Sequence, residues 1–211
     1  KDDIRWKYGV PPAGNANYAW IQHMIHHLAP NGKIGLVLAN GALSTQSSGE
    51  GDIRKNIIEA DLVEGIVAMP TQLFYSVTIP VTLWFITKGK KQKGKTLFID
   101  ARKMGTMVTR KHRDFSEEDI QKLADAFEAF QKGALAEVKG FCAIADLETI
   151  KRQDYILTPG RYVGIEEQED DGEPFEEKMA RLTSELSGLF EKSHKLETEI
   201  KERLGAIGYE I

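Results

Sequence analysis

The sequence predicts an α/β fold: a mostly parallel open sheet with an antiparallel hairpin at one edge, followed by a long coiled-coil-like helix. Three observations support this prediction. Apolar runs of strand length alternate with helical segments before residue 70. Two runs rich in β-branched and aromatic residues are joined by a short basic turn. A narrow apolar stripe recurs in alternating steps of four and three residues after residue 174.

The first part of the chain alternates helix and strand through short links. Such links imply right-handed crossovers and a parallel sheet. Asn15 or Asn17 is placed to cap the first helix. Residues 33–39 are apolar on both faces, as a central parallel strand would be. The predicted elements are, in order, a helix to about Leu28, a strand over 33–39, a helix over 53–59 and a strand over 62–68.

Residues 69–100 are predicted to hold a loop and then a hairpin. Residues 69–76 form the loop, and residues 79–87 are rich in the β-branched and aromatic types that favour strands. A basic turn over 88–95 separates this strand from a fourth one over 96–100. A turn of this length predicts that the two strands pair with each other, antiparallel, at an edge of the sheet.

The last hundred residues are predicted to be mainly helical. Ser116 is placed to cap a helix that reaches about Gln131, because three acids follow it in the first turn. Residues 134–165 are mixed, with a turn over 157–160, and residues 168–174 form an acidic linker.

A final helix is predicted from near Pro174 to about Leu204. A narrow stripe over four heptads favours a coiled-coil seam with a partner helix. The alternative is a helix that lies on its own domain. The stripe residues are Phe175, Met179, Leu182, Leu186, Leu189, Leu196 and Ile200, with Ser193 at one seam position and Ile207 beyond the helix.

Composition narrows the class of protein. No apolar run approaches the roughly 18 residues that span a bilayer, and no secretory signal opens the chain. The single cysteine, Cys142, fits a reducing, cytoplasmic location and is expected to be a small core residue. Because Lys1 stands where a methionine would begin a chain, we expect this sequence to be a piece of a longer protein.

The charges are distributed unevenly. Residues 88–113 carry a net charge of +9, whereas residues 114–211 carry −12. A basic strip of this kind indicates contact with a polyanion such as the DNA backbone, although the turn at 88–95 could equally be a solvated hairpin tip. The candidate phosphate contacts are Lys88, Lys90, Lys91, Lys93, Lys95, Arg102, Lys103, Arg110, Lys111 and Arg113.

The residues themselves show no catalytic constellation. His23 and His27 have the spacing of two metal ligands, but no third ligand accompanies them, so a surface histidine cluster with His26 is the better interpretation. Gly49 and Gly51 could open an anion site, but Glu50 between them would repel the anion. No glycine-rich dinucleotide or Walker motif is present.

A resemblance to a known family adds what these patterns lack. Seven phrases, in order, resemble the modification subunits of type I restriction enzymes, which are adenine-N6 DNA methyltransferases. The resemblance covers roughly residues 2–165. The phrases include NANYAWIQH (15–23), GKIGLVLANGALS (32–44), DLVEGIVAMP (61–70), QLFYSVTIPVTLWFITK (72–88) and DYILTPGRYVG (154–164), with further matches at 49–59 and 94–105.

This resemblance implies the C-terminal part of a Rossmann-like, S-adenosylmethionine-dependent fold. The strands here would be the fifth, sixth and seventh of seven, the last inserted antiparallel. The family's glycine-rich cofactor loop and its Asn-Pro-Pro-Phe/Tyr catalytic motif are not in this sequence, since Pro11-Pro12 follows Val10. We therefore expect no catalytic and no cofactor-binding residue here, no metal, and no activity from these 211 residues alone.

The resemblance also implies a substrate site and partners. Phe74 matches an aromatic residue that holds the flipped adenine, with Tyr75 as the second candidate. Asn40 and Ser44 follow a strand and are candidates for the pocket wall. Double-stranded DNA, a specificity subunit and a restriction subunit are the implied partners, and the last helix suits the specificity subunit.

Three regions follow from these predictions: residues 1–113 as part of the catalytic domain, 114–167 as an extension, and 168–211 as linker and assembly helix. Two alternatives stay open. One is a non-catalytic module for DNA binding and subunit assembly. The other is an adenine methyltransferase of another type, without a specificity subunit.

Overall fold

The computed structural model describes residues 2–165 and 174–209. The chain divides into two units, residues 1–167 and 168–211. The helices are α1 (Asn17–His27), α2 (Glu50–Glu59), α3 (Glu117–Lys132), α4 (Leu147–Arg152) and α5 (Phe175–Ala206). The strands are β1 (Lys33–Ala39), β2 (Val63–Ala68), β3 (Val81–Thr87), β4 (Lys95–Asp100), β5 (Thr106–Met107), β6 (Arg113–Asp114) and β7 (Cys142–Asp146).

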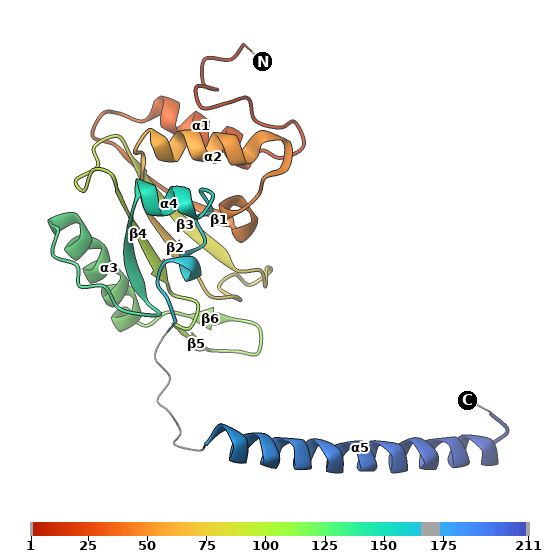
Figure 1. Cartoon of the computed structure of the whole chain (residues 1–211). Helices are drawn as coiled ribbons and strands as arrows, with labels where there is room; N and C mark the ends of the chain where they lie inside the picture. Colours follow the sequence, from red (N-terminus) through yellow and green to blue (C-terminus); the bar gives the residue numbers. More distant parts are fainter. Residues whose placement is uncertain (1, 166–173, 210–211) are drawn as a thin grey trace. The chain divides into compact units, whose positions relative to one another are not determined.

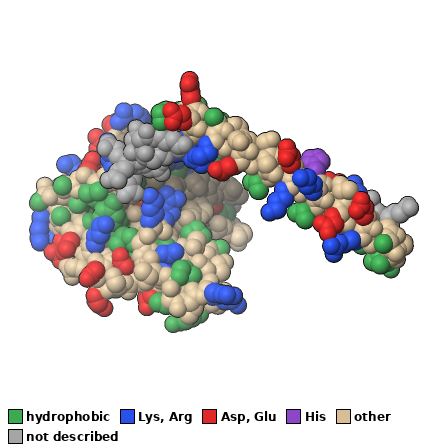
Figure 2. Space-filling model, turned by 90° about the horizontal axis from the view of Figure 1, so that it is seen from below, with side chains coloured by type: hydrophobic (Ala, Val, Ile, Leu, Met, Phe, Trp, Pro, Cys, Tyr) green, Lys and Arg blue, Asp and Glu red, His purple; other side chains and the backbone are tan. Residues whose placement is uncertain are grey.

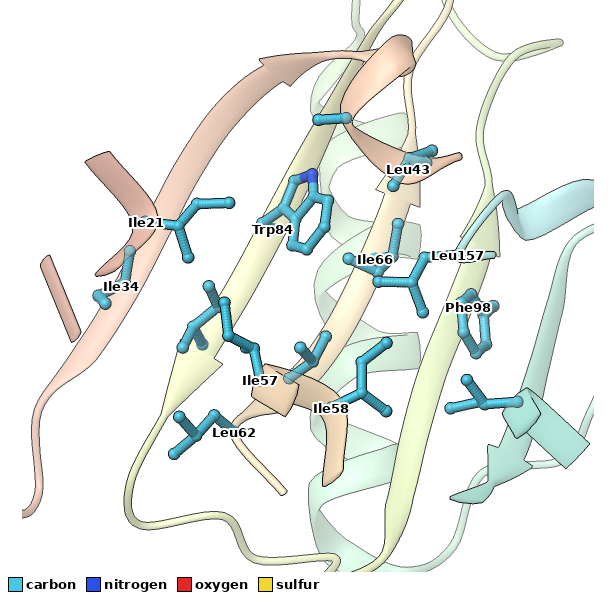
Figure 3. Close-up of a cluster of buried hydrophobic side chains, with 14 of the residues drawn as sticks. Ile21, Ile34, Leu43, Ile57, Ile58, Leu62, Ile66, Trp84, Phe98 and Leu157 are labelled. Atoms are coloured by element: carbon cyan, nitrogen blue, oxygen red, sulfur yellow. The ribbon is translucent and has the colours of Figure 1, made fainter. Parts of the chain in front are cut away.

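The first unit is a three-layer α/β/α arrangement around one mixed sheet of five strands, in the order β1-β3-β2-β4-β7 (Figure 1). One core layer packs α1, α2 and α4 against the sheet around Trp84, which is fully buried (Figure 3). The other layer packs α3 against the opposite face, through Phe130 among others. The fold class is therefore α/β, as the sequence predicts.

The prediction of a mostly parallel sheet with an edge hairpin is wrong. β3 lies between β1 and β2 and is antiparallel to both, and β7 is antiparallel to β4. Only β2 and β4 pair in parallel within the described residues. β3 and β4 do not pair with each other, because β2 lies between them. The position of β3 agrees with the antiparallel insertion that the resemblance implied.

Asp61 shows why the short turn over 88–94 does not make a hairpin. Its carboxylate accepts hydrogen bonds from Lys90 Nζ at 2.5 Å and from the Gly94 backbone N–H at 2.9 Å. Asp61 precedes β2, so the turn is fastened across the beginning of that strand. β2 is buried at all six positions, as a strand with a neighbour on each side would be.

The other predicted elements differ in smaller ways. β7 falls inside the region predicted only as mixed, and its short Cys-Ala-Ile-Ala-Asp sequence gives little strand signal. Ala16 occupies the cap position of α1, while Asn15 Oδ1 accepts the Asn17 N–H at 3.1 Å. The cap of α3 is confirmed, because Ser116 and Asp119 form a reciprocal capping box. Cys142 is buried, as expected.

β1 is less buried than a central strand would be. Its alternate positions are exposed, and Val37 is 47% exposed. Among the described residues β1 pairs only with β3, so its second backbone edge has no partner strand. The prediction that 33–39 is a central strand therefore does not hold within this structure.

The second unit consists of α5. This helix has 32 residues, starts directly after Pro174 and ends at Ala206, so Ile207 lies just beyond it as predicted. None of its residues is buried, and its seam residues Met179, Leu182 and Leu186 are 42–49% exposed. Most of the acidic linker predicted for 168–174 lies outside the described residues.

Candidate functional site

Three strand ends meet at one edge of the sheet. β1, β2 and β4 run in the same direction, because β1 and β2 are both antiparallel to β3 and β2 is parallel to β4. The segments that follow these strands are the 3₁₀ turn η1 (Asn40–Leu43), the loop over 69–80 and the segment over 101–113. Ligands bind at such carboxyl edges in open α/β sheets, so we take this carboxyl edge as the candidate site.

η1 places Asn40 at this edge. Its side chain is half-buried, and Oδ1 has no hydrogen-bond partner within the part of the chain that the structure describes. A buried amide oxygen without a partner is unfavourable by roughly 1–3 kcal/mol, so a donor that reached Asn40 Oδ1 would relieve that cost. Ser44 ends η1 and is exposed at the same edge.

The loop after β2 presents two aromatic side chains. Phe74 is 44% exposed and opens a turn that the Val77 N–H closes on the Phe74 carbonyl at 3.4 Å. Tyr75 is the next residue in that turn and is 86% exposed. Large aromatic rings are normally buried at least on one face, so two of them in succession on an uncharged loop indicate a surface for an apolar ligand.

The segment after β4 folds back as the small hairpin β5–β6, which contacts the same loop. The Arg113 N–H donates to the Gln72 carbonyl at 2.8 Å, and Gln72 Nε2 donates to the Arg110 carbonyl at 3.2 Å. The rings of Tyr75 and His112 stack with centroids 4.2 Å apart and planes 16° apart. The candidate aromatic residues and the basic hairpin therefore form one surface.

The structure does not bring the ten candidate phosphate contacts together. Arg102, Lys103, Arg110, Lys111 and Arg113 follow β4 and lie at the carboxyl edge. At the opposite edge of the sheet, Lys95 begins β4, and the turn between β3 and β4 carries Lys88, Lys90, Lys91 and Lys93. Figure 2 views the molecule from the end where β5 and β6 lie, and it shows Lys and Arg side chains among apolar ones on that face.

Several of these basic side chains already have partners. Lys90 is 7% exposed and forms an ion pair with Asp61, while burial lowers the pKa of Lys90 below its usual value. Lys88 Nζ donates to the Leu28 carbonyl at 2.6 Å, and Arg102 pairs with Asp100 at 2.6 Å. Lys90 is thus the member of the strip that is least able to reach a phosphate.

Arg113 acts partly within its own hairpin. Its Nη1 donates to the carbonyls of Met104 and Gly105 at 3.1 and 2.7 Å. Arg110 and Lys111 lie at the exposed tip, where their charges face solvent. The tip is therefore the part of the carboxyl edge best placed to meet an external anion.

Two buried charges beneath the edge were not predicted as buried. Glu50 and Arg54 in α2 are 2% and 1% exposed. Glu50 accepts from the Thr45 hydroxyl at 2.9 Å, and Arg54 Nη1 donates to the Thr45 carbonyl at 2.6 Å. Both therefore hold the segment that follows Ser44. His112 was also missed, since nothing in the sequence connects it with Tyr75.

The histidine side chains on α1 lie close to one another. His27 Nδ1 lies 2.9 Å from the His23 carbonyl, and the two rings are 4.4 Å apart. Within residues 2–165 and 174–209 no group of three or more His, Cys, Asp or Glu side chains is placed to hold a metal ion. In the same ranges no helix is both long and apolar enough to cross a membrane.

Comparison with known proteins identifies the family. A family model described as N-6 DNA Methylase matches residues 1–171. The chain belongs to this family. It is 57% identical over 210 residues to the type I restriction enzyme HindI methylase subunit of Haemophilus influenzae, a match that covers 99% of this chain and 47% of that protein.

Further relatives carry similar names. The type I restriction enzyme MjaIX methylase subunit of Methanocaldococcus jannaschii is 49% identical over 219 residues, covering 99% of this chain and 39% of that protein. The crystal structure of the type I restriction-modification methyltransferase subunit from Streptococcus thermophilus matches with 27% identity and a TM-score of 0.68, over 76% of this chain and 33% of that chain. The chain thus spans about half or less of the length of these relatives.

Proposed function

We propose that the chain is the adenine-side part of a type I DNA adenine-N6 methyltransferase, in which S-adenosylmethionine supplies the methyl group. The observation that carries this proposal is the carboxyl edge, where Asn40 follows β1, Phe74 follows β2 and the β5–β6 hairpin is hydrogen-bonded to the loop of Phe74. An apolar aromatic surface beside exposed cations suits a nucleobase with its flanking phosphates.

In this proposal Phe74, Asn40 and Ser44 form the adenine pocket, with Tyr75 as the second candidate for its aromatic face. An adenine must leave the duplex before its amine can react, and an extruded base needs an aromatic face to stack on. Phe74 is exposed enough to provide that face. Asn40 Oδ1, buried and without a partner among the described residues, can accept a hydrogen bond from a base N–H.

The reacting groups belong to other parts of the protein. The amine of adenine is a weak nucleophile because its lone pair is delocalised into the ring. Orientation of that amine falls to the family's Asn-Pro-Pro-Phe/Tyr motif, which this sequence lacks. What these residues contribute is to hold the base and to position the DNA, which lowers the entropic part of the barrier.

Among the described residues, the glycines at the start of α2 do not suit S-adenosylmethionine. Gly49 and Gly51 flank the first residue of α2, but that residue, Glu50, is 2% exposed and accepts a hydrogen bond from Thr45. Its carboxylate, like that of Asp52, would repel the carboxylate of the cofactor. We therefore assign no cofactor contact to this chain.

DNA-backbone contact is assigned first to the carboxyl edge. Arg102, Lys103, Arg110, Lys111 and Arg113 follow β4 at the same carboxyl edge as the proposed adenine pocket, and phosphate contacts there would set its register on the duplex. Lys88, Lys91, Lys93 and Lys95 would contact DNA only if the duplex also passed the opposite edge.

α5 is proposed as the assembly element for a specificity subunit, with a restriction subunit joining the same complex. It keeps an exposed apolar seam from Phe175 to Ile200, which is about 39 Å of helix. A seam of this length is stable in water when another helix covers it. The companion helix is expected on the specificity subunit.

Methyl transfer in the full-length protein tests this function. Phe74→Ala should lower the rate of methyl transfer to DNA much more than it lowers the melting temperature, because the ring is 44% exposed. Ile4→Ala, an exposed apolar residue away from the edge, is the matched control. Residues 1–211 alone should transfer no methyl group. An unchanged rate for Phe74→Ala removes it from the pocket, and transfer by the isolated chain contradicts our assignment of the reacting groups.

An assembly module is the second candidate, and the exposed seam of α5 favours it. Methyl transfer by residues 1–211 alone is the assay that separates these two candidates, whereas deletion of residues 174–211 tests the assembly role of α5. Loss of association with a specificity subunit supports the proposed role of α5. Unchanged association contradicts it and favours an adenine methyltransferase of another type.

A further inference from the structure

Tyr75 and His112 form a stacked pair whose outer face is open. Their ring centroids are 4.2 Å apart and their planes differ by 16°, so the rings overlap face to face. Tyr75 is nevertheless 86% exposed. One face of the tyrosine ring is covered by His112, and the exposure therefore belongs to the other face and to the edge. This leaves a flat aromatic surface directed at solvent.

Hydrogen bonds between the two loops hold this pair in place. Gln72 binds the hairpin through both its backbone carbonyl, which accepts from Arg113 N–H, and its side chain, which donates to the Arg110 carbonyl. At the tip, the N–H groups of Val108 and Thr109 donate to the His112 carbonyl at 3.0 and 3.2 Å. A surface fixed in advance loses less conformational entropy when a ligand stacks on it.

A packing role alone does not explain the residues at this position. His112 Nδ1 is buried and has no hydrogen-bond partner among the described residues, which is unfavourable. A leucine would cover the tyrosine ring without that cost. A planar histidine, in contrast, keeps the tyrosine ring flat against it and leaves the opposite face parallel and accessible.

The surrounding charge selects the class of ligand. Residues 69–80 carry no charged side chain, and residues 101–113 carry five basic and no acidic side chains. Arg110 and Lys111 are exposed beside His112 at the hairpin tip. An open aromatic face with two adjacent cations is the combination that binds unpaired nucleotides, where the base stacks and the phosphates meet the cations.

We propose that Tyr75 and His112 are a second base-stacking surface, distinct from Phe74, which takes an unpaired nucleobase while Arg110 and Lys111 contact its flanking phosphates. This inference rests on the proposed DNA methyltransferase function. Phe74 begins the turn and bridges to Val77, whereas Tyr75 is turned to the hairpin. The two rings can therefore hold different bases when a duplex is opened at the carboxyl edge.

The test compares two short fluorescein-labelled duplexes on the full-length protein: one with a single bulged adenine, and the same duplex fully paired. The wild type should prefer the bulged duplex. Tyr75→Leu should reduce that preference about fivefold or more, the range expected for loss of one base-aromatic stack. Tyr75→Phe should retain it. Trp20→Leu, another exposed aromatic residue (57%), is the matched control.

Several outcomes would overturn the inference. One is a Tyr75→Leu variant that keeps the full preference, and another is a Tyr75→Phe variant that loses it, because the hydroxyl rather than the ring would then matter. If Tyr75→Leu lost binding to a protein partner and kept the preference for the bulged duplex, the surface would be a protein-docking site instead. If the full-length protein methylates DNA but Tyr75→Leu has no effect, only this inference fails. If it neither methylates nor binds DNA, the proposed function fails.

Discussion

The hydroxyl of Tyr18 donates a hydrogen bond to the carbonyl oxygen of Ala42 at 2.6 Å. Tyr18 belongs to α1 and is fully buried, and Ala42 belongs to η1, the turn that begins at Asn40. This contact therefore ties the first helix to one wall of the proposed adenine pocket. Burial raises the pKa of Tyr18 to about 12, because the phenolate would lose its hydration.

Replacement of Tyr18 by phenylalanine tests the strength of this contact. Tyr18→Phe keeps the ring but leaves the Ala42 carbonyl without its donor, so we expect a loss of about 1–2 kcal/mol in the free energy of unfolding. Urea denaturation at neutral pH measures it. Tyr209→Phe, which changes an exposed tyrosine, should have no effect and serves as the control. Equal stability of Tyr18→Phe and wild type would show that the hydrogen bond contributes nothing net.

The same residue predicts how stability depends on alkaline pH. Tyr18 has a folded-state pKa of about 12, whereas an unfolded tyrosine ionises near pH 10. The stabilisation that Tyr18 gives the folded state is complete below pH 10. It is lost as pH rises from about 10 to about 12, because the unfolded chain releases the tyrosine proton at a lower pH than the folded chain. The free energy of unfolding should fall by up to about 1.4 kcal/mol per pH unit more in wild type than in Tyr18→Phe. Urea titrations across this window give the two slopes, and parallel slopes would contradict the assignment.

How much of the fold could be predicted depends on whether the signal was local. The cap of α3 follows from Ser116 and the acids after it, and the structure confirms it. The hairpin prediction is wrong because β3 and β4, neighbours in sequence, are separated by β2 in the sheet. The position of the turn depends on Asp61. Its carboxylate accepts hydrogen bonds from Lys90 and Gly94, and these hold the turn across the beginning of β2. No local pattern carries that information.

In the candidate site, too, local features could be predicted and contacts between distant residues could not. Phe74 and Tyr75 were placed by the resemblance, which fixes their position after the sixth strand of the family. The stack of Tyr75 on His112 could not be predicted, since it depends on the path of residues 101–113 and on two hydrogen bonds of Gln72. Net charge could not show that the basic strip is divided between opposite edges of the sheet, because that division follows from the strand order.

Arg54 is expected to be the most sensitive charged residue of α2. Its Nε donates to the Tyr155 carbonyl at 2.7 Å and its Nη1 to the Thr45 carbonyl at 2.6 Å. Arg54→Leu leaves both carbonyls without a donor and should cost about 3 kcal/mol or more in the free energy of unfolding. Arg152→Leu, at an exposed arginine of α4, is the control. Chemical denaturation compares the two, and similar values for both would contradict a structural role for the buried guanidinium.

The free edge of β1 predicts that residues 1–211 associate when isolated. Val37 is 47% exposed, and it lies opposite the half-buried Leu83 on the same face of the sheet. This apolar face extends to the outer edge of β1, which has no partner strand in the described part of the chain. Such edges invite pairing with another chain, and an edge lysine prevents it. Val37→Lys should reduce concentration-dependent association in sedimentation velocity, whereas Ile4→Lys should not. Association unaffected by Val37→Lys would place the contact elsewhere, for example on α5.

The division of the basic residues leads to a matched comparison in DNA binding. Arg110→Gln/Lys111→Gln removes two charges at the carboxyl edge, and Lys91→Gln/Lys93→Gln removes two exposed charges at the opposite edge. Each phosphate contact contributes about 0.9 to the slope of log affinity against log salt concentration. In the full-length protein the first variant should therefore lower that slope by about 2 and weaken binding to all sequences similarly, while the second leaves the slope unchanged. Fluorescence anisotropy at several salt concentrations measures both. Equal losses in the two variants would mean that charge acts through the overall field rather than through contacts at the carboxyl edge.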